Sequence, residues 1–351
     1  MTNTSARLLF IPVSGPMGMG EYARSLAIAT AMAQRSPGVE VHFALSRAAP
    51  YAAATPFATT LLPSSPTFHP REVSALIREF RPQVVVFDNA GRTQQLRAAA
   101  AAGARVVFVS SRRRQRRKAF RLRWLPLIDE HWIAYPEFIA GSLTPLERLK
   151  LRLAGRPRIR YVDTLLPLPD ATLATSTLAR FGLAARGYVL IVPGGGTAHP
   201  GAEDAPGIVA AAAGAIAARG YATLLVGGNA GASNDPAQLQ RTPLLPLAQL
   251  CELIRAARVV ICNGGDTLLQ VLACGRPCVA VSIAHDQAHR IECCARAGLA
   301  RPAPLDSQAI HSAAIGLLES QSLQPTTVRP GQPRVRDCLE EVVSALSALT
   351  S

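Results

Sequence analysis

One stretch, residues 259–300, constrains the fold most, because it contains a strand, a turn, a helix and a second strand in succession. Residues 259–262 (VVIC) form a short apolar run that stops at an Asn-Gly-Gly turn, and residues 278–283 (CVAVSI) form the next run. Short apolar strands around a helix are typical of a parallel βαβ unit. Either Asp266 or Thr267 can cap the helix by accepting a hydrogen bond from a first-turn N–H group. Glycines before a helix suit an anion at its electropositive N-terminus, although they also serve a merely tight turn.

The chain opens with the same kind of unit. Residues 7–13 (RLLFIPV) predict a strand, residues 14–21 a glycine-rich loop, residues 22–34 a helix and residues 39–45 a second strand. Another series of strands starts at residues 188–192 (YVLIV), followed by a glycine loop whose backbone N–H groups are available to a phosphate. This order predicts an α/β fold of doubly wound parallel sheets, whose ligands bind at the carboxyl ends of the strands.

The N-terminal loop also has the glycine spacing of a dinucleotide site. Gly18-x-Gly20-x-x-Ala23 fits the Rossmann fingerprint. The acidic residue expected about 20 residues further on falls near His42 and Phe43, so the sequence does not favour this function.

Composition excludes several classes of protein. With 49% hydrophobic residues the chain is not disordered, and its 351 residues suffice for two ordinary domains. The apolar runs are too short to span a bilayer and the N-terminus lacks a signal-peptide pattern, so we expect a cytoplasmic protein. The seven cysteines lack a zinc spacing and indicate reduced, packed thiols. We expect no metal site or cofactor, because no Asp-x-Asp motif occurs and His285 and His289 lack a third ligand cluster.

Positive charge is concentrated in one section of the chain. Of a net charge of +14, most comes from residues 105–160, where 15 Lys or Arg residues accompany 4 Asp or Glu residues. The densest run is RRRQRRKAFRLRW at residues 112–124. It can be a solvated loop, or it can contact an anionic membrane surface or a phosphorylated acceptor. Nucleic acid is a less favoured partner, because no nucleic-acid module surrounds the run. The candidate residues for an anionic partner are Arg112, Arg113, Arg114, Arg116 and Arg117.

The central stretch carries a family resemblance. Gly264-Gly265-Asp266-Thr267-Leu268-Leu269-Gln270, then Gly275-x-Pro277, then Asp286-Gln287 resemble the nucleotide-sugar motif of GT-B glycosyltransferases. The groups with a similar pattern are MurG, the UDP-glycosyltransferases and the UDP-sugar hydrolase of pseudaminic acid synthesis. The resemblance implies two Rossmann-like domains facing a cleft, with the nucleotide-sugar on the C-terminal domain and the acceptor on the N-terminal domain.

The resemblance also implies the donor contacts. Gln270 stands where the family usually has a Glu that holds the ribose, and Asp286 with Gln287 match the pair that holds the donor sugar. Asp266 departs from the pattern, since a carboxylate would repel a diphosphate if it faced it. The implied diphosphate contacts are Gly195, Gly196, Thr197, Gly264, Gly265 and Thr267.

The N-terminal loop resembles the Gly-x-Gly-His-x-x-Arg opening of the same family. Gly18, Gly20 and Arg24 match this pattern, and Glu21 replaces the His that the family uses at the reactive centre of the sugar. As a carboxylate, Glu21 can take a proton from an acceptor hydroxyl. It can equally be an acidic residue that the helix dipole favours in a first turn.

Asp88 is a second candidate base. It follows the apolar strand at residues 83–87 and would face a ligand at the carboxyl edge of the sheet. The alternative is that it caps the helix expected at residues 93–102.

The expected domain limits follow from the linker and the resemblance. Residues 1–165 form the N-terminal Rossmann-like acceptor domain and residues 166–334 the C-terminal nucleotide-sugar domain, with a Pro-rich linker at residues 163–170. Residues 335–351 are expected to form a helix that packs back on the N-terminal domain, as in the family.

The sequence therefore predicts a metal-independent, inverting glycosyltransferase. Its donor would be a nucleotide-diphosphate sugar, with UDP favoured, and its acceptor a lipid-linked or glycan molecule of cell-envelope polysaccharide synthesis. The protein would be cytoplasmic or peripheral on the inner face of the membrane. Two alternatives stay open: a nucleotide-sugar hydrolase, in which water replaces the acceptor, and a non-catalytic nucleotide-binding protein, which the changes at Glu21 and Gln270 would suit.

Overall fold

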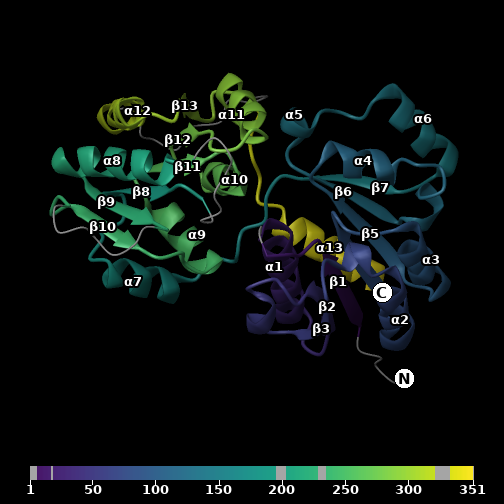
Figure 1. Cartoon of the computed structure of the whole chain (residues 1–351). Coiled ribbons are helices and arrows are strands. Elements are labelled where there is room, and N and C mark those ends of the chain that lie inside the picture. Colours follow the sequence, from purple (N-terminus) through teal and green to yellow (C-terminus); the bar gives the residue numbers. More distant parts are fainter. Residues whose placement is uncertain (1–5, 17–18, 195–202, 228–234, 321–332, 351) are drawn as a thin grey trace. The chain divides into compact units, whose positions relative to one another are not determined.

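The structure is a computed structural model and describes residues 6–16, 19–194, 203–227, 235–320 and 333–350. The chain divides into two compact units: Met1–Leu165 together with Cys338–Ser351, called unit 1, and Leu166–Asp337, called unit 2 (Figure 1). Each unit is built on a parallel sheet covered by helices. The predicted α/β class with two doubly wound sheets is therefore confirmed.

Unit 1 is organised around seven strands: β1 (Arg7–Pro12), β2 (Glu40–Ser46), β3 (Ala58–Leu62), β4 (Val84–Asp88), β5 (Arg105–Ser110), β6 (Glu130–Ala134) and β7 (Arg158–Val162). Their order is β3-β2-β1-β4-β5-β6-β7, and every neighbouring pair is parallel. The chain winds outward from β1 to β3 and then returns to β4 on the other side of β1. This reversal makes the carboxyl ends of β1 and β4 the expected ligand edge.

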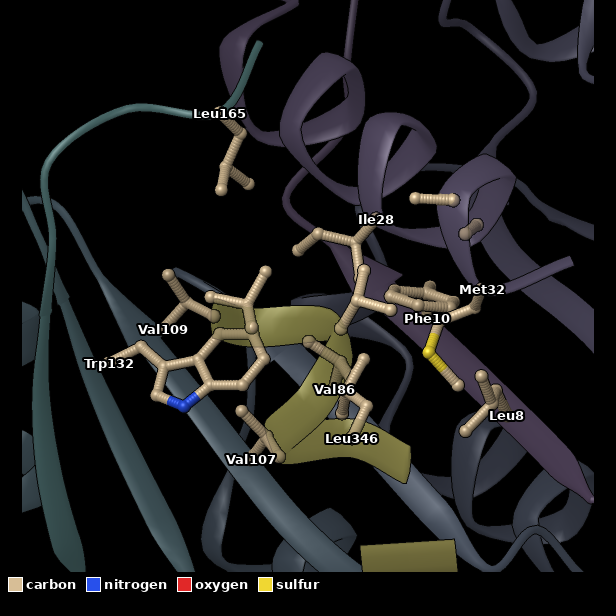
Figure 2. Close-up of a cluster of buried hydrophobic side chains, with 14 of the residues drawn as sticks. Leu8, Phe10, Ile28, Met32, Val86, Val107, Val109, Trp132, Leu165 and Leu346 are labelled. Atoms are coloured by element: carbon tan, nitrogen blue, oxygen red, sulfur yellow. The ribbon is translucent and has the colours of Figure 1, made fainter. Parts of the chain in front are cut away.

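Alternate residues of the apolar strands point to opposite faces, so helices cover both faces of the unit 1 sheet. Leu8 and Phe10 pack with α1 (Gly20–Arg35) and α13 (Leu339–Thr350) on one face (Figure 2). Leu9 and Phe87 pack with α2 (Pro70–Phe80) and α3 (Thr93–Ala101) on the other. Between β5 and β7 the chain adds α4 (Arg113–Ala119), η3 (Leu125–Leu127), α5 (Glu137–Ala140) and α6 (Pro145–Ala154).

The C-terminal helix α13 is part of unit 1. Val342 and Leu346 are buried in the same cluster as Ile28 and Met32 of α1 (Figure 2). An ion pair of 3.2 Å between Arg160 and Glu341 fastens the helix beside β7. The last segment of the chain thus completes the core that the first strand begins.

Unit 2 is organised around six strands: β8 (Tyr188–Val192), β9 (Ala222–Val226), β10 (Leu239–Thr242), β11 (Val259–Asn263), β12 (Cys278–Val281) and β13 (Arg301–Ala303). Their order is β10-β9-β8-β11-β12-β13, again parallel throughout, so the reversal lies between β8 and β11. The helices are α7 (Ala171–Arg180), α8 (Ala205–Ala218), α9 (Leu247–Ala256), α10 (Asp266–Ala273), α11 (Gln287–Arg296) and α12 (Ser307–Glu319).

The central stretch has the predicted strand, turn, helix and strand, but the predicted cap of its helix is wrong. Gly265 is the N-cap residue of α10, and neither Asp266 nor Thr267 makes a capping hydrogen bond from its side chain. The Asn263 Oδ1 instead accepts a hydrogen bond of 2.9 Å from the Gly265 N–H. Asp266 therefore becomes the first residue of the helix, where the dipole favours its charge.

Candidate functional site

A polar cluster lies at the carboxyl ends of β1, β4 and β5 in unit 1. Glu21, in the first turn of α1, accepts hydrogen bonds from the Asn89 Nδ2 at 3.0 Å and from the Arg112 Nη2 at 3.4 Å. Among the described residues both bonds end on the same carboxylate oxygen, Oε1. The side chain of Glu21 is 15% exposed, so it is held in place without being sealed from a ligand.

Asn89 fixes this carboxylate and is itself fixed. Its Oδ1 accepts a hydrogen bond of 2.9 Å from the Ser111 N–H, and its Nδ2 donates to the Ser111 hydroxyl as well as to Glu21. The backbone of Asn89 is left-handed, with φ of 51°. That conformation is uncommon outside glycine and clusters at functional sites, and Asn is one of the residues that tolerate it.

Asp88 is bound in a different way from either sequence-based interpretation. Its two oxygens accept hydrogen bonds of 2.7 and 2.8 Å from Arg24 Nε and Nη2, and the carboxylate is only 1% exposed. It does not cap α3, whose N-cap residue is Arg92. A buried, bidentate partner of a guanidinium is poorly placed to meet an acceptor. Asp88 therefore holds Arg24 and leaves Glu21 as the accessible carboxylate of the cluster.

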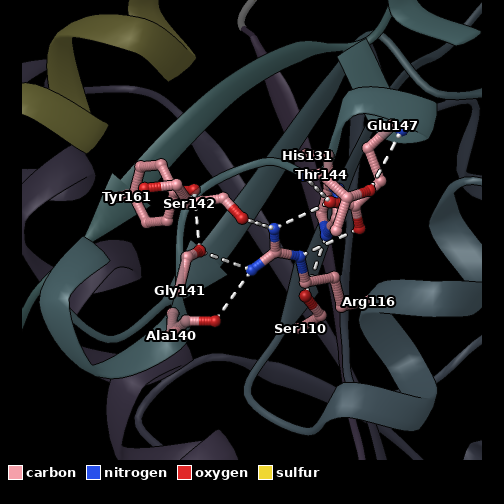
Figure 3. A network of polar contacts seen from close by, with 9 residues as sticks. All are labelled: Ser110, Arg116, His131, Ala140, Gly141, Ser142, Thr144, Glu147 and Tyr161. Atoms are coloured by element: carbon pink, nitrogen blue, oxygen red, sulfur yellow. Dashed lines mark hydrogen bonds and ion pairs between the residues drawn. The ribbon is translucent and has the colours of Figure 1, made fainter. Parts of the chain in front are cut away.

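Residues 113–119 of the basic run form the helix α4, and the arginines of the run divide into inward and outward side chains. Arg116 points inward and donates to the carbonyls of residues 140–142, while its guanidinium pairs with Glu147 at 2.9 Å (Figure 3). Phe120 and Trp124 are buried, and the Trp124 indole N–H donates to Thr93. Arg116 therefore already has hydrogen-bond and ion-pair partners within unit 1, and its contact with an external anionic partner stays a prediction.

The outward residues of the run remain accessible to a partner. Arg113, Arg114 and Arg117 of α4 are exposed. Arg112 is also exposed, although it reaches Glu21.

His131 lies beside this helix and is a structural residue. It is fully buried on β6, and its Nε2 is 2.8 Å from the Ser110 hydroxyl (Figure 3). Burial, and secondarily the charge of Arg116, lowers the pKa of His131 to about 3. The imidazole is therefore neutral at physiological pH, and it packs against the rings of Phe108 and Phe120.

The predicted donor turn, Gly264–Gly265, lies at the carboxyl edge of the unit 2 sheet. Neighbouring side chains pack closely against its backbone. A Cβ on Gly264 would lie 2.7 Å from the Ile291 side chain and 2.9 Å from that of Gln287, both on α11. A Cβ on Gly194, after β8, would lie 2.5 Å from the Asn263 Nδ2. The glycines are therefore required by the approach of α11 and Asn263. A small pocket at this edge is lined by residues that include Ile191, Pro193, Asn263 and Ile283.

The other predicted donor residues differ in how accessible they are. Thr267 and Gln270 are half-buried on α10, and the side chain of Asp286 is 78% exposed. Gln287 is buried, and its Oε1 accepts a hydrogen bond of 3.0 Å from the Ile283 N–H. The Gln287 carbonyl thus shapes the loop after β12. Asp286 is the accessible member of the pair.

Three predicted phosphate contacts and one loop glycine fall outside the described residues: Gly195, Gly196, Thr197 and Gly18. Gly20 is described and forms the first residue of α1, directly before Glu21. The structure thus brings Gly20, Glu21, Arg24, Asp88 and Arg112 into one cluster.

Sequence reasoning missed three residues that build these sites. Asn89 and Ser111 orient Glu21, and Arg290 of α11 donates a hydrogen bond to the Gly264 carbonyl and lies 3.9 Å from Asp286. Asn89 and Ser111 were visible as polar residues directly after apolar strands. Nothing in the sequence indicated that Arg290 faces the donor turn.

The described parts of the chain contain no group of three or more His, Cys, Asp or Glu residues arranged to hold a metal ion. No helix in those parts is long and apolar enough to cross a bilayer.

A scan against protein-family models finds no match for this sequence, and a search of curated proteins finds none either. Solved structures match over almost the whole chain. The kitacinnamycin glycotransferase has a TM-score of 0.64 at 16% identity, covering 99% of this chain and 100% of that one. MurG from Acinetobacter baumannii has a TM-score of 0.62 at 14% identity, covering 98% and 99%. A Listeria monocytogenes protein assigned as a UDP-N-acetylglucosamine 2-epimerase has a TM-score of 0.61 at 12% identity, covering 98% and 96%.

These likenesses span both units and agree with the strand orders described above. At such low identity they define the architecture alone, and one of these structures is assigned to another reaction of a nucleotide-sugar. The chain has the GT-B fold, with the two Rossmann-like domains of the glycosyltransferases that it resembles.

Proposed function

We propose that this protein transfers a sugar from a nucleotide-diphosphate donor to an acceptor hydroxyl, with inversion at the anomeric carbon and without a metal ion. The donor is UDP-linked, and the acceptor is a lipid-linked or glycan molecule of cell-envelope polysaccharide synthesis. The reaction takes place in the cytoplasm, at or near the inner face of the membrane. The observation that carries the proposal is the arrangement of Glu21 at the ligand edge of unit 1.

Glu21 has the geometry of a general base. Asn89 and Arg112 hold Oε1, and within the described residues no hydrogen bond is made to Oε2, which can receive the proton of an acceptor hydroxyl. The acceptor oxygen then attacks the anomeric carbon as its proton passes to Glu21. A general base of this kind contributes about 10²–10⁴-fold to the rate.

The leaving group is the nucleoside diphosphate. The bond between the anomeric carbon and the phosphate oxygen breaks, and the diphosphate keeps the electron pair. Groups at the point where charge develops would stabilise it, namely the N-terminus of α10, which the Gly264–Gly265 turn positions, and the Thr267 hydroxyl near the start of that helix. Gly195, Gly196 and Thr197 are proposed to contribute in the same way.

The proposed contacts to the ribose and to the donor sugar are assigned to side chains that are accessible on unit 2. Gln270 lies one turn into α10 and is proposed to bind the ribose hydroxyls. Asp286 is proposed to bind the donor sugar, with Gln287 holding the loop that carries it. Asp88 acts through Arg24 and is not proposed as a base.

The proposal is tested by following both products of the reaction. Purified protein is incubated with UDP-sugars and a mixture of lipid-linked and glycan acceptors, and UDP release and sugar transfer are measured separately. We expect UDP release that depends on the acceptor and continues in the presence of a chelator. UDP release at the same rate with water alone would show a hydrolase instead. No release with any UDP-sugar would contradict the proposed reaction.

A nucleotide-sugar hydrolase is the second candidate. The spacing Gly18-x-Gly20-x-x-x-Arg24 is similar to the loop of such hydrolases, and Glu21 Oε2 could equally take a proton from water. Glu21→Gln distinguishes a catalyst of either kind from a binding protein, because only a catalyst has turnover to lose.

A further inference from the structure

The helix α6 buries none of its ten residues. Three of its leucines are exposed: Leu146 by 59%, Leu149 by 52% and Leu153 by 79%. The spacing of three and four residues places these leucines along one side of the helix. A run of exposed leucines on a single helix is the kind of surface that marks an interaction site.

The helix is held firmly to unit 1. A capping box between Thr144 and Glu147 begins it, and Glu147 also pairs with Arg116 of α4 at 2.9 Å (Figure 3). The Lys150 ammonium donates a hydrogen bond of 3.3 Å to the Phe120 carbonyl. The exposed leucines are therefore displayed by a fixed helix.

The surroundings of the leucines are cationic. Arg148 and Arg152 are exposed on the same helix, whose one carboxylate, Glu147, is neutralised by Arg116. The segment Arg121-Leu122-Arg123, directly after Phe120, is exposed, with Leu122 at 73%. The α6 face is defined here as Leu122, Arg121, Arg123, Leu146, Arg148, Leu149, Arg152 and Leu153.

We propose that the α6 face docks on an anionic lipid bilayer, with α6 lying in the plane of the interface. Leucines in the headgroup–acyl boundary and arginines against anionic headgroups are the two contributions that bind such helices. The arginines favour an anionic surface over a neutral protein partner. The leucines favour a bilayer over a nucleic acid, whose phosphate backbone offers nothing for them to bury against.

This docking is independent of the chemistry proposed for Glu21. No residue of the α6 face belongs to the donor turn or to the Glu21 cluster. Lipid binding and sugar transfer can therefore fail separately in experiments.

The test is flotation of the full chain with vesicles. We use phosphatidylcholine alone and phosphatidylcholine with about 30% phosphatidylglycerol, at about 0.1 M NaCl. The wild-type protein should float with the anionic vesicles and bind neutral ones about tenfold more weakly. The variant L146Q/L149Q/L153Q should lose about tenfold in binding to anionic vesicles. The variant R148Q/R152Q should lose a similar factor and respond less steeply to added salt.

Matched control variants distinguish binding through the α6 face from nonspecific binding to vesicles. The variant L61Q/F68Q removes exposed apolar side chains elsewhere in unit 1, and R219Q/R296Q removes exposed charges in unit 2; both should bind like the wild type. Thermal unfolding checks that each variant is folded.

Four results would overturn the proposal. The wild-type protein could fail to float with anionic vesicles, or the leucine variant could bind them as the wild type does. Light scattering could show that the leucine variant converts a dimer to a monomer, which would make the face a contact between copies of this chain. Binding of single-stranded RNA by wild type and leucine variant alike, without vesicle binding, would assign the arginines to nucleic acid.

Discussion

The site at the strand ends of unit 1 consists of polar side chains, whereas the site at the strand ends of unit 2 consists mainly of glycine backbone. In unit 1, charged and amide side chains converge: Glu21, Asn89 and Arg112 in one group, and the Arg24–Asp88 pair beside them. In unit 2, the turn consists of glycines pressed between Asn263 and α11, with Arg290 fastened to its backbone. Side chains suit proton transfer, whereas a helix N-terminus behind a glycine turn suits an anion. In the proposed function, unit 1 therefore carries out the chemistry and unit 2 binds the donor.

The largest expected effect comes from Glu21→Gln. Gln keeps the shape of Glu21 but cannot take a proton, so kcat should fall by about 10²–10⁴-fold with little change in donor affinity. Steady-state kinetics and donor titration measure the two quantities. Glu292→Gln, at an exposed position of unit 2, is the control and should leave both unchanged. A loss of donor affinity in Glu21→Gln as large as the loss of kcat would contradict the proposal that unit 1 carries out the chemistry and unit 2 binds the donor.

The next largest effect concerns stability in unit 1. Asp88→Asn removes the buried negative charge that pairs with the largely buried Arg24 guanidinium, and breaking a buried ion pair costs about 3–5 kcal/mol of unfolding free energy. Urea denaturation measures this change. The exposed pair Arg219–Glu319 gives the control, since Glu319→Gln should cost less than about 1 kcal/mol. Equal small effects in the two variants would mean that Asp88 is not the anchor of the cluster.

A smaller effect is expected at the donor turn. Gly264→Ala forces a methyl group against Ile291 and Gln287, and such overpacking costs about 1–3 kcal/mol. It should also displace the turn and weaken nucleotide binding by roughly tenfold, about 1.4 kcal/mol. Gly214→Ala in α8 is the control, because nothing lies within 4 Å of its Cβ position and Ala favours a helix. If Gly264→Ala binds nucleotide as tightly as the wild type, the turn is not the donor site.

The smallest effect, taken per pH unit, is a pH dependence confined to unit 1. His131 has a folded-state pKa of about 3, below its unfolded value, so the unfolded chain binds more protons between these values. Its contribution to stability is complete above the unfolded pKa, about 6.5, and is lost as the pH falls towards 3. The slope should approach about 1.4 kcal/mol per pH unit within this window.

Hydrogen exchange at pH 7 and pH 5 can locate this acid sensitivity, which should appear in unit 1 before unit 2. His131→Gln should flatten the slope, whereas His311→Gln, in the partly exposed part of α12, should not. Should His131→Gln fail to fold, NMR titration of the wild-type imidazole replaces it. Protonation of His131 near pH 6 in the folded protein would contradict the buried, neutral state.

Much of the fold could be predicted because it depends on local patterns. The apolar runs, the glycine turns and the lengths between them specify two parallel sheets, and the strand ends mark where ligands bind. The position of Glu21 beside the end of β4 follows from that topology. The structural neighbours confirm the GT-B resemblance that the motif at residues 264–287 indicated.

Most of what could not be predicted depends on contacts between residues distant in the chain. Asp88 pairs with Arg24, which is 64 residues away in the sequence, whereas the local spacing had also suggested that Asp88 caps a helix. Arg116 looked like one more cation in a run, but the turn of α4 directs it to Glu147. The predicted cap of α10 was wrong because the Asn263 side chain binds the Gly265 N–H, so the helix has Gly265, one residue before Asp266, as its N-cap. For Asp88 and Arg116 the partner lay outside the window that the sequence pattern covers, whereas Asn263 lay inside it, two residues before Gly265.

The most direct test of the account is isothermal titration of the purified chain with UDP, GDP and dTDP and their sugars, with and without magnesium. We expect UDP and a UDP-sugar to bind with micromolar affinity that magnesium does not change. Thr267→Ala and Gln270→Ala should weaken this binding, and Glu21→Gln should preserve it. Absence of binding to every nucleotide, or binding that Thr267→Ala and Gln270→Ala leave intact, would contradict the assignment of the donor site and with it the proposed reaction.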